Sequence, residues 1–189
     1  MRLFIAVDLD DAARAAIAAE QKRVAAAMGE ARSSVKWVKP EHMHMTLVFL
    51  GEVSDAHAPA IVDSVSRPVA MPAFAITFQG LGVFPSHGGP RAVWVGITDG
   101  GAELTELQRE IARRVTDAGV ALESRPFHPH LTLGRWRQSR PSDRRRMLSA
   151  SRPDVVTRVA VPVATLYQSR ISSAGPTYTA LAHANLSGR

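Results

Sequence analysis

The octet PFHPHLTL at residues 126–133 repeats a pattern that the chain first shows at residues 40–47 as PEHMHMTL. Both octets read Pro-x-His-x-His-x-Thr-Leu, and the matching histidines His44 and His130 lie 86 residues apart (130 − 44 = 86). Four of the seven histidines therefore belong to two copies of one pattern. A polar pattern that recurs inside two apolar segments indicates a fold with two similar halves.

The spacing of apolar and polar residues predicts the same order of elements around each octet. Each half begins with an apolar strand and a helix, reaches its histidine strand, and continues with a second helix and a further strand. The first helix starts at Asp10 or Asp11 and stops at Gly29. The other predicted elements are strands at 2–8, 42–50 and 74–84 with a helix at 54–67 in the first half, and strands at 92–97, 130–136 and within 155–171 with helices near 104–115 and 142–150 in the second.

These elements predict an α+β fold for a single domain over residues 1–189. Two α/β lobes, near 2–84 and 92–171, would carry antiparallel-rich sheets that face each other across a central cleft and are related by an approximate twofold axis. A last strand at 176–186 would complete the sheets. The alternative is a simple doubly wound fold, but no glycine-rich phosphate loop follows any predicted strand.

Composition excludes several classes of protein. An apolar content of 46% over 189 residues is typical of an ordered globular chain. The absence of cysteine excludes disulfide bonds, thiolate nucleophiles and cysteine–zinc sites. The apolar run LFIAV is far too short to span a membrane, and Asp8 follows it at once, unlike in a signal peptide. We therefore expect a cytoplasmic protein with no membrane partner. We also expect a monomer, although composition does not determine the oligomeric state.

Positive charge is concentrated in one part of the chain. The net charge is +6, and residues 135–158 contain eight arginines against two aspartates. Arginine presents a planar set of donors that fits phosphate. Two interpretations stay open: a surface that faces a polyanion, or a solvated helix face.

The histidine–threonine spacing points to acid–base chemistry on a phosphate. Side chains alternate along a strand, so His44 and Thr46 share one face, as do His130 and Thr132. An approximate twofold axis would bring both pairs to one groove. Histidine titrates near pH 6.5, so one ring can accept a proton while the other donates one, and threonine hydroxyls can bind phosphate oxygens. The pattern therefore predicts cleavage of a phosphodiester.

The histidines also allow three other interpretations. His42 and His128 fit best as structural residues that orient the site or start the strand. A metal site is an alternative because His-x-His on a strand can bind metal, but no acidic residue recurs beside the octets and threonine is a poor zinc ligand. A non-catalytic RNA-binding module is another alternative, although it has no need for paired histidine and threonine. We expect no metal and no cofactor.

Beyond the octets, longer segments carry a family resemblance. The segments RLFIAVDL, KWVKPEHMHMTLVFLGEV, GLGVFP, HPHLTLGR and LYQSRISSAGPTYTAL occur in this order and span nearly the whole chain. Together they resemble the 2H phosphoesterase superfamily, named for its two His-x-Thr motifs. The resemblance is closer to the RNA 2′,3′-cyclic phosphodiesterases of bacteria and archaea, also called 2′-5′ RNA ligases or LigT-like proteins.

The resemblance implies two α/β lobes around a basic cleft and metal-independent opening of an RNA 2′,3′-cyclic phosphate to a 2′-phosphate. It makes His44 the general acid and His130 the general base, although these two labels can be exchanged by the pseudo-symmetry. It makes Thr46 and Thr132 phosphate ligands. The expected partners are RNA or nucleotides with 2′,3′-cyclic phosphate ends, and the same residues would serve the reverse 2′-5′ ligation.

Two further residues are implicated by the resemblance alone: Arg135 as a phosphate contact and Phe49 as a platform for a base. Strict alternation along each strand turns both away from the histidines and threonines. They reach the cleft only if the strands bend or bulge near Leu50–Gly51 and Gly134.

Overall fold

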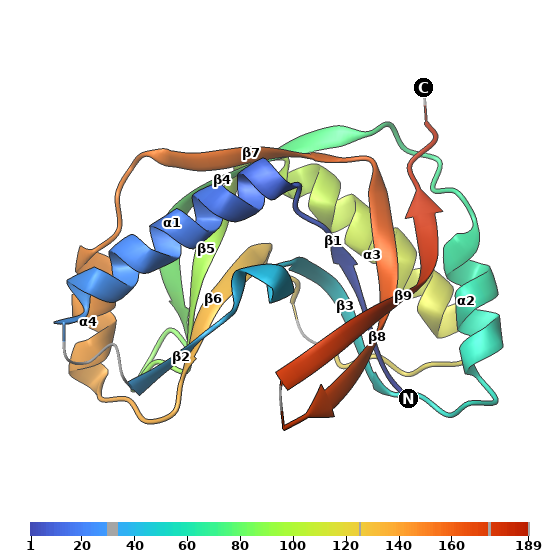
Figure 1. Ribbon diagram of the computed structural model, residues 1–189. Coiled ribbons are helices and arrows are strands. Elements are labelled where there is room, and N and C mark those ends of the chain that lie inside the picture. Colours follow the sequence, from blue (N-terminus) through green and yellow to red (C-terminus); the bar gives the residue numbers. More distant parts are fainter. Residues whose placement is uncertain (30–33, 125, 174, 189) are drawn as a thin grey trace.

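The computed structural model of the protein describes residues 1–29, 34–124, 126–173 and 175–188. Its strands and helices form two antiparallel sheets with helices packed on their outer sides (Figure 1). The strands are β1 Arg2–Val7, β2 Val35–Trp37, β3 Met45–Glu52, β4 Phe74–Phe84, β5 Ala92–Asp99, β6 His130–Trp136, β7 Val155–Val161, β8 Val163–Ser172 and β9 Gly175–Asn185. The helices are α1 Asp11–Ala27, α2 Ala58–Ser66, α3 Gly101–Asp117 and α4 Pro141–Ser149, and Pro40–His42 form a 3₁₀ turn.

The two sheets confirm the predicted mixed fold with antiparallel pairing. The four-stranded sheet has the order β3-β1-β8-β9, and the five-stranded sheet has the order β2-β6-β5-β4-β7. Each histidine strand pairs with the strand that opens its half of the chain, β3 with β1 and β6 with β5. The third strand in each set of three is β8 beside β1 and β4 beside β5.

The sheets differ from the predicted lobes at 2–84 and 92–171. Strand β4 closes the first segment but belongs to the five-stranded sheet, and β8 closes the second segment but belongs to the four-stranded sheet. The two halves therefore exchange their last strands. The exchange occurs in the second half at Pro162, which separates β7 in one sheet from β8 in the other. The last strand, which the sequence predicts at 176–186 to complete the sheets, is β9 and extends the four-stranded sheet.

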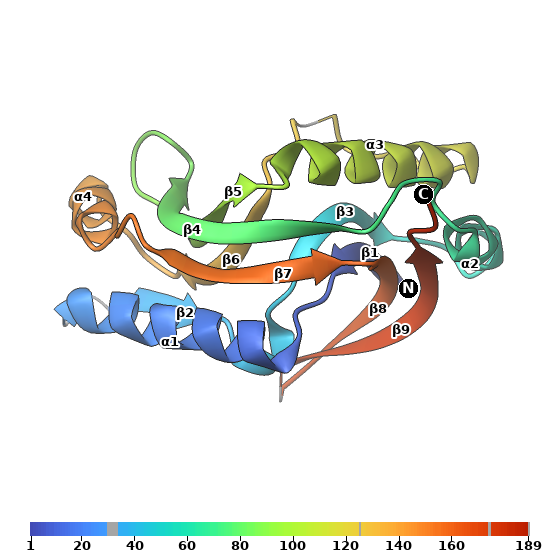
Figure 2. The same ribbon diagram turned by 90° about the horizontal axis from the view of Figure 1, so that it is seen from above.

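The helices cross between the halves in the same way. Helix α1 follows β1 but packs against β7, and α3 follows β5 but packs against β3 (Figures 1 and 2). Apolar spacing explains why these segments are helical and which face they bury. In α3 the buried residues are Leu104, Leu107, Ile111 and Val115, as the sequence predicts.

The starts of two elements differ by several residues from the sequence prediction. Strand β3 begins at Met45 rather than at residue 42, because Pro40–His42 form the 3₁₀ turn and His44 lies just before the strand. Helix α2 begins at Ala58 rather than at 54, with Pro59 in its first turn, where a missing N–H costs nothing.

None of the helices in the described ranges is long and apolar enough to cross a membrane.

Candidate active site

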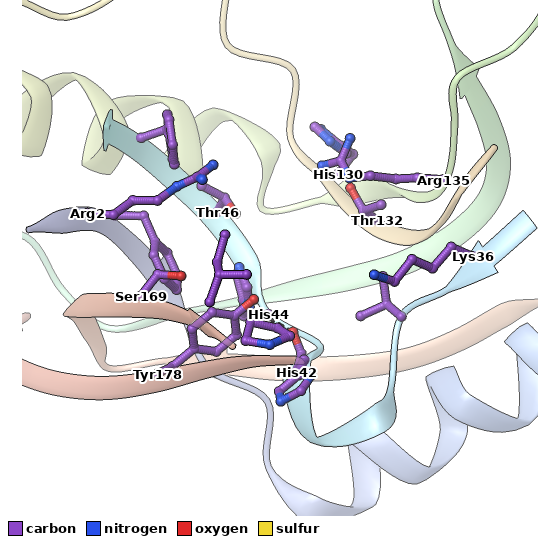
Figure 3. A pocket seen from close by; sticks show the side chains of 15 residues that line it. Arg2, Lys36, His42, His44, Thr46, His130, Thr132, Arg135, Ser169 and Tyr178 are labelled. Carbon is purple, nitrogen blue, oxygen red and sulfur yellow. Dashed lines mark hydrogen bonds between the residues drawn. The ribbon is translucent and has the colours of Figure 1, made fainter. Parts of the chain in front are cut away.

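A cleft of about 370 Å³ lies between the two sheets and is lined by all six residues that the sequence singles out (Figure 3). His44, Thr46 and Phe49 come from the β3 side, and His130, Thr132 and Arg135 come from β6. In Figure 3, His130, Thr132 and Arg135 face His44 and Thr46 across the cavity. The other lining residues are Arg2, Phe4, Lys36, Val38, His42, Ser169, Ile171, Pro176 and Tyr178.

Equivalent bulges turn Phe49 and Arg135 toward this cleft. The β1–β3 register skips Leu47, and the β5–β6 register skips Leu133, which is the matching residue of the second octet. One extra residue reverses the alternation of faces beyond it. The bulge predicted near Gly134 is confirmed at the adjacent Leu133. A register shift at Leu50 confirms the one predicted near Leu50–Gly51, but the bulge that reorients Phe49 is at Leu47.

A glycine is needed next to the second bulge. A Cβ atom on Gly134 would lie 2.7 Å from the Val35 side chain and 3.1 Å from the Trp37 ring. Strand β2, which pairs with β6 here, approaches too closely for any side chain. This contact holds Lys36, whose Cα partner is Arg135, at the edge of the cleft.

Both cleft histidines are held in the same orientation by the chain that precedes them. The Nδ1 atom of His44 lies 2.9 Å from the carbonyl oxygen of His42, and Nδ1 of His130 lies 2.6 Å from that of His128. A carbonyl only accepts, so each neutral ring donates from Nδ1 and keeps Nε2 for a ligand. The orienting role expected of His42 and His128 is thus carried by their backbone.

Aromatic rings surround both imidazoles. The His44 ring stacks on Phe4 at 4.8 Å, and the His130 ring meets the edge of Phe84 at 5.0 Å and lies 5.8 Å from Trp94. Burial lowers the pKa of both histidines, and the carbonyl hydrogen bonds oppose that effect. The neutral imidazole is therefore favoured at both positions.

The charged neighbours of the two histidines differ. The Asp8 carboxylate raises the pKa of His44 and outweighs Arg14, which lowers it, whereas the Arg135 guanidinium lowers the pKa of His130. Continuing the pairing of Ala6 with Thr46 by two residues places Asp8 beside His44. At the equivalent place in the other half, Gly96 pairs with His130.

Asp8 is fixed by two hydroxyl donors from β8. Tyr167 Oη donates at 2.7 Å and Thr165 Oγ1 donates at 2.9 Å. A small cavity of about 200 Å³ is lined by Asp8, His44 and Tyr167, among others. Burial and the Asp8 carboxylate raise the pKa of Tyr167 well above its usual range. Sequence reasoning missed Asp8, because it follows an apolar strand as any strand-ending acid does.

Helix α1 contacts the backbone near both histidines, which the sequence also did not reveal. Arg14 donates to the carbonyls of Leu9, Pro40 and Met43, just before His44. Two turns later, the buried Gln21 donates from Nε2 to Val38 O at 2.7 Å and to Leu133 O at 2.8 Å. One helix therefore fixes the loop before His44 and the bulge after Thr132.

The walls of the cleft differ in polarity. On the side of the four-stranded sheet, Phe49 and Ile171 are large apolar residues that are 50% and 70% exposed, and the Arg2 guanidinium lies 5.0 Å from the Phe49 ring. On the other side, Lys36 and Arg135 supply positive charge. Among the eight arginines of 135–158, all of which the structure describes, Arg135 alone lines the cleft.

The described residues contain no group of three histidine, aspartate or glutamate side chains that could together hold a metal ion. The donors present at the cleft are two imidazoles with two threonine hydroxyls. That donor set suits proton transfer and phosphate binding better than metal coordination. The absence of a metal and of a cofactor stays a prediction.

Known proteins resemble the chain over most of its length. The profile of the 2′-5′ RNA ligase superfamily matches residues 14–161. An RNA 2′,3′-cyclic phosphodiesterase of Archaeoglobus fulgidus is 38% identical over 75% of this chain and 76% of its own length. One of the same name from Methanothermobacter thermautotrophicus is 33% identical, covering 95% of both chains.

Solved structures agree with these relatives. A protein of Thermus thermophilus, TT0787, superposes with a TM-score of 0.78 at 26% identity over the whole of both chains. Escherichia coli LigT complexed with 3′-AMP superposes with a TM-score of 0.75 at 28% identity, covering 98% of this chain and 97% of LigT. The resemblance predicted from the sequence is confirmed, and the chain belongs to the 2′-5′ RNA ligase superfamily.

Proposed function

We propose that this protein hydrolyses the 2′,3′-cyclic phosphate at the end of an RNA and leaves a 2′-phosphate. The observation that carries the proposal is the matched pair of imidazoles in one cleft, each bound through Nδ1 to a carbonyl so that Nε2 can exchange a proton. The relatives named RNA 2′,3′-cyclic phosphodiesterase and the LigT complex with 3′-AMP support a nucleotide end as the substrate.

In the proposed reaction, a water molecule attacks phosphorus on the side opposite the ribose O3′ atom. His130 takes a proton from this water as the new P–O bond forms. His44 gives a proton to O3′ as the P–O3′ bond breaks, so the products are a 2′-phosphomonoester and a 3′-hydroxyl. Thr46 and Thr132 donate hydrogen bonds to the non-bridging oxygens, whose charge grows in the transition state.

The charges beside the histidines support this division of roles. A general acid must carry a proton, and the Asp8 carboxylate favours the protonated form of His44. A general base must be neutral, and the Arg135 guanidinium favours the neutral form of His130. Exchanging the roles would place each charge against the form that its histidine needs.

The polarity of the walls supports one orientation of the substrate. A base stacked on the exposed Phe49 ring places the ribose on the His44 side, where O3′ departs. Arg135 then lies beside the phosphate on the His130 side, from which water enters.

One chain supplies every group of this site, which fits the expected monomer, and a chain without cysteine fits the expected cytoplasmic location.

The test is incubation of the purified protein with adenosine 2′,3′-cyclic phosphate, with and without EDTA, followed by separation of 2′-AMP from 3′-AMP. We expect 2′-AMP in equal yield under both conditions. Loss of turnover with EDTA would instead support a histidine–metal site. Absence of any product, with RNA ends as well, would support a binding module.

A further inference from the structure

The net charge of the molecule resides in one segment. Residues 135–158 hold eight arginines and two aspartates, a net charge of +6, which equals that of the whole chain. The remaining residues are therefore balanced, with 15 basic (23 − 8) and 15 acidic (17 − 2) side chains. The arginines are Arg135, Arg137, Arg140, Arg144, Arg145, Arg146, Arg152 and Arg158.

Ion pairing sharpens the contrast with the rest of the molecule. Elsewhere, Arg23, Arg67, Arg113 and Arg114 each pair with a carboxylate, within their own helix or at its end. No ion pair involves any of the eight arginines in the parts of the chain that the structure describes. No carboxylate therefore neutralises their charge, although the Arg144 guanidinium is engaged by a backbone carbonyl.

Helix α4 gathers this charge around an exposed apolar residue. A shallow hollow on α4 is lined by six residues, which we call the α4 surface: Pro141, Ser142, Arg144, Arg145, Leu148 and Ser149. Leu148 is 39% exposed among these polar and charged neighbours. The helix dipole favours Arg146 in the last turn, but it does not explain Arg140 at the N-cap, where a cation is unfavourable. Arginines that no carboxylate neutralises are suited to bind the phosphate backbone of a nucleic acid.

The α4 surface is connected to the cleft in two ways. Arg135 and Arg137 flank the buried Trp136, and both are exposed, so positive charge continues past the end of β6 toward α4. Arg144 donates to Pro85 O at 2.7 Å, and the preceding residue, Phe84, contacts the His130 ring. Figures 1 and 2 place α4 at the end of the five-stranded sheet that lies away from the four-stranded sheet. A nucleic acid bound in the cleft must therefore extend beyond it to reach α4.

We propose that the α4 surface binds the phosphate backbone of the RNA upstream of the end held in the cleft. From the ribose on the His44 side, the RNA strand would cross the mouth of the cleft past Lys36, continue along Arg137 and Arg140, and reach Arg145 and Leu148. This inference rests on the proposed function for the identity of the polyanion. It makes an RNA of several nucleotides a better ligand than a mononucleotide.

The test measures binding rather than turnover. A fluorescein-labelled 12-nucleotide RNA and a dinucleotide, both ending in a 2′-phosphate, are titrated with protein, and anisotropy is followed from 50 to 200 mM salt. The variant is Arg145→Glu. Its control is Arg109→Glu on α3, another exposed helical arginine without an ion pair in the described chain, which changes the net charge equally.

We expect Arg145→Glu to weaken binding of the 12-nucleotide RNA by about fivefold to tenfold at 50 mM salt and to reduce the salt slope by about 0.7. Arg109→Glu should change it by less than about twofold, and the dinucleotide should not distinguish the variants. Equal effects of the two variants, or equal affinity of wild-type protein for both RNAs, would overturn the proposal. Hydrolysis of adenosine 2′,3′-cyclic phosphate is measured separately for the wild-type protein and Arg145→Glu, and it tests only the cleft. If neither protein hydrolyses this substrate, the proposed function fails, but the binding measurement still tests the α4 surface.

Discussion

The strands β3 and β6 present the same backbone to the cleft and set different charges beside it. Each carries a histidine tied to the carbonyl two residues before it, a threonine, and a bulged leucine, Leu47 or Leu133. Beyond the bulge, the equivalent positions hold Phe49 and Arg135, and beside the histidines they hold Asp8 and Gly96. The duplicated geometry aims two proton carriers at one phosphate, and the residues that break the symmetry give them different tasks.

Removing either imidazole should have the largest effect. We expect His44→Ala and His130→Ala each to lower kcat on adenosine 2′,3′-cyclic phosphate by about 10²–10⁴-fold, because each loses one proton transfer. His128→Ala is the matched control: its exposed side chain is outside the cleft lining, and its carbonyl still orients His130. We expect less than about a threefold loss there. Full activity in either of the first two variants would remove the two-histidine mechanism.

The pair Phe49 and Arg135 tests whether equivalent positions serve different parts of the substrate. Arg135→Met should lower kcat/KM by about 10–100-fold for every 2′,3′-cyclic phosphate, because a charge-assisted hydrogen bond to phosphate is lost. Phe49→Ala should raise KM by about 10-fold for a nucleotide, because base stacking is lost, and little for ribose 2′,3′-cyclic phosphate, which lacks a base. A Phe49→Ala effect of equal size on both substrates would contradict its role as a platform.

Asp8 and Arg135 should shift opposite sides of the pH–rate profile. Loss of the Asp8 charge in Asp8→Asn lowers the pKa of His44. The protonated form of His44 is then lost at a lower pH, so the alkaline limb of the profile moves to lower pH. Loss of the Arg135 charge raises the pKa of His130. The neutral form of His130 then appears only at a higher pH, so the acid limb of the profile moves to higher pH. At pH 7.5, Asp8→Asn should be slower by roughly fivefold.

The profile is measured as kcat/KM from pH 4.5 to 9. Tyr167→Phe is the control for Asp8→Asn, since it removes one hydrogen bond to the carboxylate but keeps the charge. We expect a smaller displacement of the alkaline limb in this variant. If Asp8→Asn moved the acid limb instead, the roles of the two histidines would have to be exchanged.

The sequence predicted what local spacing determines. The apolar positions of α3 and the two octets depend on residues a few places apart, and both are where the prediction put them. The exchange of β4 and β8 between the sheets could not be predicted, because any apolar strand can pair with several others and the choice is made by packing of the whole molecule.

The site shows the same limit at the scale of single residues. The glycines indicate bulges near Leu50–Gly51 and Gly134, and register shifts at Leu50 and Leu133 confirm both, but the shift that turns Phe49 toward the cleft is at Leu47. These leucines bury their side chains, so nothing in their identity marks an irregular strand. Gln21 likewise reads as one polar residue in an alanine-rich helix until its two carbonyl partners are seen.

The contacts of α1 give the smallest expected effect and extend the comparison to stability. Gln21→Leu keeps the volume but leaves the partly buried carbonyl of Val38 without its side-chain donor, so the free energy of unfolding in urea should fall by about 1–2 kcal/mol. The carbonyl of Leu133 still accepts from the Val38 N–H, which limits the loss. Arg14→Met should cost less stability, because its half-buried partners near Pro40 can bind water instead, yet it should lower kcat by loosening the chain before His44. A larger loss of stability for Arg14→Met than for Gln21→Leu would contradict this comparison, because it would show that the carbonyls bound by Arg14 contribute more to the stability of the fold than those bound by Gln21.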